Sequence, residues 1–379
     1  MPEKKQSTHP SIECRCDAFD SAVQVIDGLM EHACRMRASD IHIDPHPLET
    51  VVRMRIDGQL EPIGTIRRQL HEEVIARLKI LSGARTDLHA VPQDGRFRTK
   101  VADAPYNIRI SFMPTYHGEN AVIRLLPASF GVADTFAGLG FTPDHAALIL
   151  KTLRMPNGLI LATGPTGSGK TTTLRVCLGL KAAEQISVMT LEDPVEYEVP
   201  GVRHVHIRES FGVTFASGLR SALRQDPDVI MVGEIRDAET ARTAVATALT
   251  GHLVLSTLHT NSALDTILRL AQMGLERYLI AATLKLVISQ RLVRTICRAC
   301  DGTSGCIACR GGGFIGRSVV AEVLEIDDGL RDLIIRGESA ASVRDYVLNL
   351  GFRELCRDAD EKVEWGVTTR DEVLRALNT

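Results

Sequence analysis

The amino-acid sequence predicts a two-domain α/β protein whose larger domain is a doubly wound, mostly parallel sheet. Three observations lead to this prediction. The chain has 379 residues, which is more than one compact core usually holds. Its apolar residues switch repeatedly between helical and strand spacing. In the second half, short apolar runs alternate with helical segments, which is the pattern of strands joined by crossover helices.

The first 128 residues have the pattern of a small mixed domain. Apolar residues recur at helical spacing over 20–37 and 70–81, and alternating runs at 51–56, 106–112 and 121–126 predict strands. Asp57-Gly58 predicts a hairpin turn. We divide the chain into a polar tail (1–15), an N-terminal α/β domain (16–128), a linker (129–143), a larger α/β domain (144–330, with a cysteine loop at 297–309) and a helical C-terminal region (331–379).

Composition and charge limit the classes of partner. The net charge is −3, aromatic residues make up 4% of the chain and there is one Trp, so little is available for phosphate neutralisation or base stacking. No apolar run approaches the roughly 18 residues of a membrane-spanning helix, and the polar start has no signal segment. We therefore expect no nucleic-acid partner, no transmembrane segment and no secretion.

A complete phosphate-binding loop follows the apolar run Leu159–Ala162. Backbone N–H groups of such a loop surround phosphate oxygens, the lysine reaches the β- and γ-phosphates, and the following hydroxyl ligates magnesium. The helix that opens next favours anions at its N-terminus. This pattern predicts that ATP and Mg²⁺ bind at Gly164, Pro165, Thr166, Gly167, Ser168, Gly169, Lys170, Thr171 and Thr172.

Polar side chains follow three later apolar runs of the larger domain. Glu234 comes one residue after Val229–Val232, Glu192 follows the run that ends at Leu191, and His259 lies just beyond the run that starts at Leu253. In open α/β sheets, ligands bind at the carboxyl ends of the strands. Glu234 could hold magnesium or polarise the attacking water. Taken singly, each could instead be a surface glutamate or a structural histidine.

Four cysteines crowd one short stretch of the chain: Cys297, Cys300, Cys306 and Cys309. Two pairs with two residues inside each pair supply the four thiolates of a tetrahedral structural Zn²⁺ site. Five residues separate the pairs, which is a short spacing for such a module. The alternative is a set of reduced thiols on a glycine-rich loop.

Together these segments resemble the GspE/PilB-type secretion ATPase superfamily, the motors of type II secretion and type IV pilus assembly. Gly164–Thr171 matches the Walker A loop, Glu192-Asp193-Pro194 the Asp box, Val229–Glu234 the Walker B element and Thr257–Thr260 the His box. The resemblance continues upstream through Arg55-Ile56-Asp57-Gly58 and Pro92–Arg96. It implies a RecA-like P-loop ATPase domain, a smaller PAS-like α/β N-terminal domain and a helical C-terminal tail.

The resemblance also implies roles for particular residues and partners. Glu234, Glu192 and His259 would be catalytic, and Arg109 and Arg124 of the first domain would reach the γ-phosphate. Arg220, Arg224 and Arg236 match arginines at the subunit interface of a homo-hexamer, and the four cysteines match a zinc module of the assembly motors. The motor would be cytoplasmic and peripheral at the inner membrane, where platform and docking proteins of the machine would bind it.

Three alternatives stay open at this stage. A nucleic-acid translocase shares the ATPase core, but it would need a basic or aromatic channel. A pilus-retraction ATPase shares the motifs but generally lacks the cysteine module. A non-catalytic nucleotide-binding scaffold is disfavoured because Lys170, Glu192, Glu234 and His259 are all present.

Overall fold

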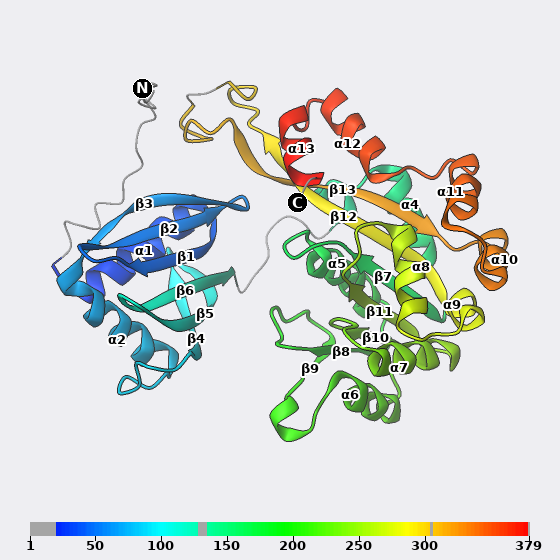
Figure 1. Cartoon of the computed structure of the whole chain (residues 1–379), viewed down its shortest axis with the longest axis horizontal. Helices are drawn as coiled ribbons and strands as arrows, with labels where there is room; N and C mark the ends of the chain where they lie inside the picture. The colour runs from blue at the N-terminus through cyan, green and yellow to red at the C-terminus, as the bar shows by residue number, and fades with distance from the viewer. Residues whose placement is uncertain (1–19, 128–134, 304–305, 378–379) are drawn as a thin grey trace. The chain divides into compact units, whose positions relative to one another are not determined.

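The structure is a computed structural model that describes residues 20–127, 135–303 and 306–377 (Figure 1). The chain forms two compact units. The first comprises residues 1–130 together with 297–316, and the second comprises 131–296 together with 317–379. The predicted polar tail (1–15) and the start of the predicted linker (129–134) lie outside the described residues.

The first unit is built on a six-stranded antiparallel sheet with the strand order β3-β2-β1-β6-β5-β4. The predicted Asp57-Gly58 turn joins β2 to β3, and both residues have positive φ (46° and 88°), as a tight hairpin turn requires. The strands are β1 (Ala38–Pro45), β2 (Glu49–Ile56), β3 (Gln59–Arg67), β4 (Gln93–Val101), β5 (Ala104–Thr115) and β6 (Gly118–Pro127).

Two helices, α1 (Ala22–Met36) and α2 (His71–Ser82), cover one face of this sheet. Ser21 caps α1 by accepting a hydrogen bond from the Gln24 N–H. The strands bury alternate residues against the helices, as Ile108 and Ile110 show. The residues between them, including Arg109, therefore lie on the other face, as the alternation predicts.

The second unit contains a seven-stranded sheet with the order β13-β12-β7-β11-β10-β8-β9. All pairs from β12 through β9 are parallel, which confirms the predicted doubly wound sheet. The strands are β7 (Gly158–Thr163), β8 (Val188–Glu192), β9 (Val202–His206), β10 (Val229–Val232), β11 (Leu253–Leu258), β12 (Leu284–Ile296) and β13 (Phe314–Glu325).

Helices cover both faces of this sheet, so its central strands are buried throughout. On one face Ile160 and Leu255 pack with α3 (Phe136–Leu139), α4 (Pro143–Leu153) and α5 (Lys170–Ala182). On the other, Leu161 and Val254 pack with a second group of helices. That group includes α6 (Phe215–Ala222), α7 (Ala238–Leu249), α8 (Ala263–Gln272) and α9 (Arg277–Thr283).

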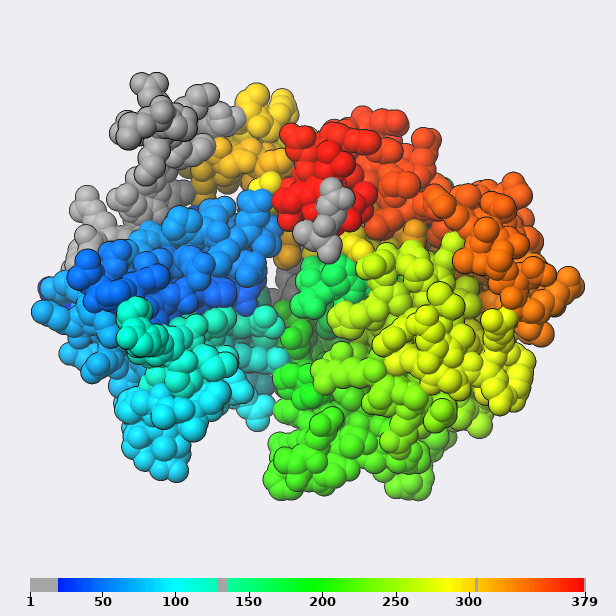
Figure 2. Space-filling view, in the orientation of Figure 1, coloured from blue at the N-terminus to red at the C-terminus, as the bar shows by residue number. Residues whose placement is uncertain are grey.

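The predicted helical C-terminal region consists of α10 (Asp328–Arg336), α11 (Ala340–Asn349), α12 (Leu355–Glu364) and α13 (Arg370–Leu377), coloured orange to red at the surface in Figure 2. An ion pair holds α13 to β12. The Arg294 guanidinium donates to Oε2 of the buried Glu372 at 2.8 and 3.0 Å. None of the described helices combines the length and apolarity that crossing a bilayer would need.

Four strands were not predicted from the sequence: β3, β4, β9 and β12. The residues 297–316, which the sequence analysis placed within the larger domain, group with the first unit. The reason is local. Arg310 donates to the main-chain carbonyls of Met36 and Arg35 at the end of α1, and the Gly316 N–H donates to Asp57 Oδ2 at 3.0 Å.

Candidate functional site

The predicted phosphate-binding loop lies between β7 and α5, at the carboxyl edge of the second unit's sheet. Gly164, Gly167 and Gly169 all have positive φ (137°, 80° and 90°), which lets the loop curl. A Cβ at Gly164 would lie 2.5 Å from Gln290 O, so this position accepts glycine alone. The loop is therefore a fixed cradle that presents backbone N–H groups at the start of α5.

Lys170, the first residue of α5, is directed back over the loop. Its Nζ donates to Gly164 O at 2.8 Å and to Pro165 O at 2.9 Å. Burial lowers the pKa of Lys170 to about 8, while the Glu234 carboxylate opposes this shift. A bound phosphate would stabilise the charged amine, so the residues fit a nucleotide phosphate.

Gln290 on β12 holds the phosphate-binding loop to the start of α5 through hydrogen bonds. The sequence analysis did not predict this role. Its Nε2 donates to Ser168 O at 2.8 Å, and its Oε1 accepts from Thr173 Oγ1 at 2.9 Å. The side chain is fully buried, so both ends of the amide are satisfied within the protein. Sequence reasoning missed it because its signal is a single glutamine in a strand far along the chain.

Glu234 and His259 come together beside Lys170, from the ends of neighbouring strands β10 and β11. Arg236 Nη2 donates to Glu234 Oε1 at 2.5 Å, and His259 Nε2 lies 3.9 Å from Glu234 Oε2. Partial burial and the Lys170 charge lower the pKa of His259, with Glu234 opposing them. A neutral imidazole and a held carboxylate next to a phosphate cradle can orient a water molecule for attack.

Glu192 ends β8, and its strand end is fastened to that of β10. The Gly233 N–H donates to Leu191 O at 2.8 Å, and a Cβ at Gly233 would lie 3.6 Å from Glu192 Cα. The buried Glu192 carboxylate accepts a hydrogen bond from Thr190 Oγ1 at 2.6 Å. The two predicted acids therefore stand on the carboxyl ends of adjacent strands.

Of the three predicted interface arginines, the structure places two on the exposed surface of α6 and the turn after it. Arg220 donates to Glu239 Oε1 at 3.1 Å, and Arg224 donates to Arg220 O and Ser221 Oγ, both at 3.2 Å. Arg236 also pairs within its own chain, and its partner is the predicted catalytic residue Glu234.

Arg109 and Arg124 lie directly opposite each other on β5 and β6 of the first unit. The row continues across the sheet, since Arg96 pairs in register with Arg109, and Asp40 with Arg124. Arg124 Nε donates to the buried Asp40 Oδ1 at 3.0 Å. Like charges opposite one another on neighbouring strands are destabilising. The row of Arg96, Arg109, Arg124 and Asp40 therefore concentrates positive charge on one face of the sheet.

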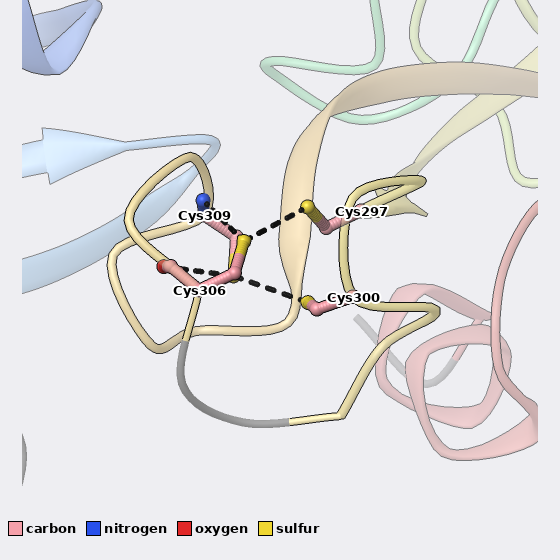
Figure 3. Close-up of side chains that lie close together, drawn as sticks. All are labelled: Cys297, Cys300, Cys306 and Cys309. Carbon is pink, nitrogen blue, oxygen red and sulfur yellow. Dashed lines mark hydrogen bonds between the residues drawn. The ribbon is translucent and has the colours of Figure 1, made fainter.

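The four cysteine side chains converge from two turns of the 297–316 segment (Figure 3). All four sulfur atoms lie within 4.8 Å of one another, with Sγ–Sγ distances of 3.5 Å for Cys297–Cys306, 3.5 Å for Cys300–Cys309 and 3.3 Å for Cys306–Cys309. Sulfur atoms about 2.3 Å from a tetrahedral zinc would be about 3.8 Å apart. A disulfide would need about 2.05 Å. The donor set and spacing fit zinc.

Backbone donors also point at the sulfur atoms. The Cys309 N–H donates to Cys306 Sγ and the Gly313 N–H to Cys309 Sγ, each at 3.3 Å. Such bonds favour the thiolate form that a metal requires. Cys297 and Cys309 are buried, and the other two cysteines are half-buried.

A parallel α/β sheet with this loop and these strand-end carboxylates defines a P-loop nucleotide-binding protein. The chain belongs to the Type II/IV secretion system protein family, whose model matches residues 17–375. The match confirms the family that the motifs predicted.

Individual relatives are similar over nearly the whole chain. Type II secretion system protein HxcR of Pseudomonas aeruginosa is 42% identical over 375 residues, which are 97% of this chain and 80% of that protein. Type II secretion system protein E of Klebsiella pneumoniae is 39% identical over 97% of this chain and 78% of its own length. The type IV pilus assembly ATPase PilB of Thermus thermophilus is 39% identical over 98% of this chain, but the match spans 44% of PilB.

Solved structures share the fold. The pilus retraction motor PilT with bound ADP superimposes with a TM-score of 0.66 and 27% identity, over 92% of this chain and 96% of PilT. The ATPase DotB of Legionella pneumophila has a TM-score of 0.72 and 24% identity, over 94% of this chain and 96% of DotB. The predicted RecA-like P-loop fold is thereby confirmed.

Proposed function

We propose that this chain hydrolyses ATP and works as a hexameric motor that drives assembly of a type II secretion pseudopilus or a type IV pilus. The observation that carries the proposal is the convergence of Lys170, Glu234 and His259 around a preformed phosphate cradle. The relatives named for type II secretion and pilus assembly support the choice of machine.

In this proposal, Mg²⁺ supplies charge neutralisation at the phosphates when it is bound. The exposed Thr171 hydroxyl at the start of α5 would hold the ion. Glu234 would accept the proton of the attacking water, and Glu192 on the adjacent strand end would orient water at the metal. His259, held neutral at neutral pH by its lowered pKa, would contact the γ-phosphate side of the site.

The zinc ion would be a structural clamp. The four thiolates would hold the 297–316 segment in the shape that places Arg310 on the carbonyls at the end of α1. The presence of this module favours an assembly motor over the retraction motor that the PilT similarity would otherwise allow. We place the motor at the cytoplasmic face of the inner membrane, with Arg220 and Arg224 at the contact between neighbouring subunits of the ring.

The experiment that tests the function measures phosphate release from ATP by the full chain with Mg²⁺. We expect the parent protein to turn over ATP, and Lys170→Ala to lose both nucleotide binding and turnover, because its amine contacts the phosphates. Lys151→Ala is the matched control, since Lys151 lies exposed on α4 and pairs with Glu325 on β13. A parent protein that binds ATP without releasing phosphate would show a nucleotide-binding scaffold instead.

The arginine row gives a second expected result. Arg109→Ala and Arg124→Ala should each lower turnover by about a hundredfold or more, because arginines that contact the γ-phosphate contribute about 10³–10⁵ to phosphoryl transfer. Affinity for ADP should stay unchanged, since ADP lacks that group. Arg67→Ala, at the far edge strand and paired with Asp20, is the control. Parent rates in both variants of the assembled protein would make the two arginines structural.

A further inference from the structure

His204 on β9 packs against the Glu192 carboxylate, and neither the motifs nor the resemblance singled it out. β8 and β9 pair in register with Thr190 opposite His204, so the two side chains share one face of the sheet. Glu192 lies two residues along β8 from Thr190 and therefore projects from the same face. The His204 and Glu192 side chains are 10% and 9% exposed, so the contact is almost completely removed from solvent.

The hydrogen bonds around the imidazole fix where its proton lies. The Val199 N–H donates to His204 Nε2 at 2.9 Å, so Nε2 must be an unprotonated acceptor. The proton is then on Nδ1, which lies 2.8 Å from Glu192 Oε1 and 2.9 Å from Thr190 Oγ1. The histidine is therefore neutral and donates toward the carboxylate, while Thr190 donates to the same oxygen at 2.6 Å.

This arrangement fixes the orientation of the carboxylate. Within the described part of the chain, the recorded side-chain bonds to Glu192 all fall on Oε1. Two donors on one oxygen of a buried carboxylate restrict its rotation. Oε2 is left to receive a further ligand. The Gly233 N–H donates to Leu191 O, so the strand end that carries Glu192 is fastened to the strand end that carries Glu234.

We infer that His204 is a positioning residue for the nucleotide reaction: it holds Glu192 so that Oε2 accepts a hydrogen bond from a water molecule at the phosphates. The inference rests on the proposed ATPase function and adds a residue to it. His204 also links Val199, in the connection between β8 and β9, to the same carboxylate.

The test compares substitutions that keep or remove the hydrogen-bonding pattern. His204→Leu removes both bonds, and we expect kcat to fall about ten- to hundredfold, the size of a lost hydrogen bond to a charged group. KM for ATP should change little, because Glu192 does not bind the nucleotide in this scheme. His204→Gln should restore most of kcat, since one amide can donate to Glu192 and accept from the Val199 N–H.

Two further variants keep the test decisive. His252→Leu makes the same replacement just before β11, at the amino ends of the parallel strands and so at the end of the sheet away from the phosphate-binding loop, and it should leave kcat unchanged. Thr190→Val removes the second donor to Oε1 while nearly conserving volume, and it should lower kcat without changing KM, even if His204→Leu fails to fold. Parent kcat in both His204→Leu and Thr190→Val would overturn the inference.

Equal losses in His204→Leu and His204→Gln would also overturn it, because the imidazole would then be needed for packing alone. A parent protein that does not hydrolyse ATP would remove the proposed function and this inference together. An active parent whose His204→Leu and Thr190→Val variants keep the parent kcat would remove the inference alone.

Discussion

Glu234→Gln should retain ATP binding while turnover falls by about 10²–10⁴-fold, the usual contribution of a general base. The substitution keeps the size of the side chain and its bond from Arg236, but an amide cannot accept the proton of the attacking water. The Glu234 charge acts on Lys170 by opposing the fall in the pKa of its amine, and Glu234 also pairs with Arg236 at 2.5 Å. Steady-state kinetics together with equilibrium binding of a non-hydrolysable ATP analogue measure the two effects separately.

Glu325→Gln is the matched control for this experiment. It makes the same chemical change at a side chain that is 30% exposed and pairs with Lys151 on α4. We expect parent kinetics from the control. If Glu234→Gln also turns over ATP at a near-parent rate, the general base is not Glu234, and Glu192 becomes the first candidate to examine.

Protein purified without added metal should contain one zinc ion per chain, and its removal should have the largest effect on stability. Structural zinc in small peptides contributes about 10–16 kcal/mol at neutral pH, because the site is not formed in the unfolded chain. A strong chelator, or acid that protonates the thiolates, should release the ion and expose the four thiols to a thiol reagent. Arg310 should then lose its contacts with the end of α1, so cleavage of the 297–316 segment by a protease should accelerate.

Cys309→Ser and Cys356→Ser provide the comparison. Cys309 belongs to the cluster, whereas Cys356 is an exposed cysteine on α12. The first variant should lose zinc and the protease resistance of the segment, and the second should keep both. Metal-free protein with four free thiols and a protease-resistant segment would refute the site.

The parts of the fold that sequence predicted are those whose signals are local. Four central strands of the parallel sheet are buried throughout and mostly apolar, and each carries or leads into a motif. β12 was missed because α9 passes into it at Thr283–Leu284 without an intervening turn, so no Gly, Pro or Asn marks the change. β9 was missed because its polar, half-buried residues lack an apolar alternation.

The candidate site divides in the same way. Lys170, Glu192, Glu234 and His259 lie at positions that motifs specify, so they could be proposed without a structure. Gln290 and His204 act through contacts between distant segments: Gln290 on Ser168 and Thr173, and His204 on Glu192. A glutamine or histidine in a strand has many possible roles, and only the pairing of strands shows which atom it contacts.

The membership of residues 297–316 in the first unit has a consequence for the order in which the protein can be completed. The polypeptide passes from one unit to the other three times, near residues 130, 296 and 316. During synthesis the N-terminal sheet leaves the ribosome long before Arg310 is made. Most of the second unit must therefore be synthesised before Arg310 can donate to the carbonyls at the end of α1. Residues 1–130 expressed alone would therefore lack the 297–316 segment, whereas residues 131–379 would carry that segment without the rest of its unit.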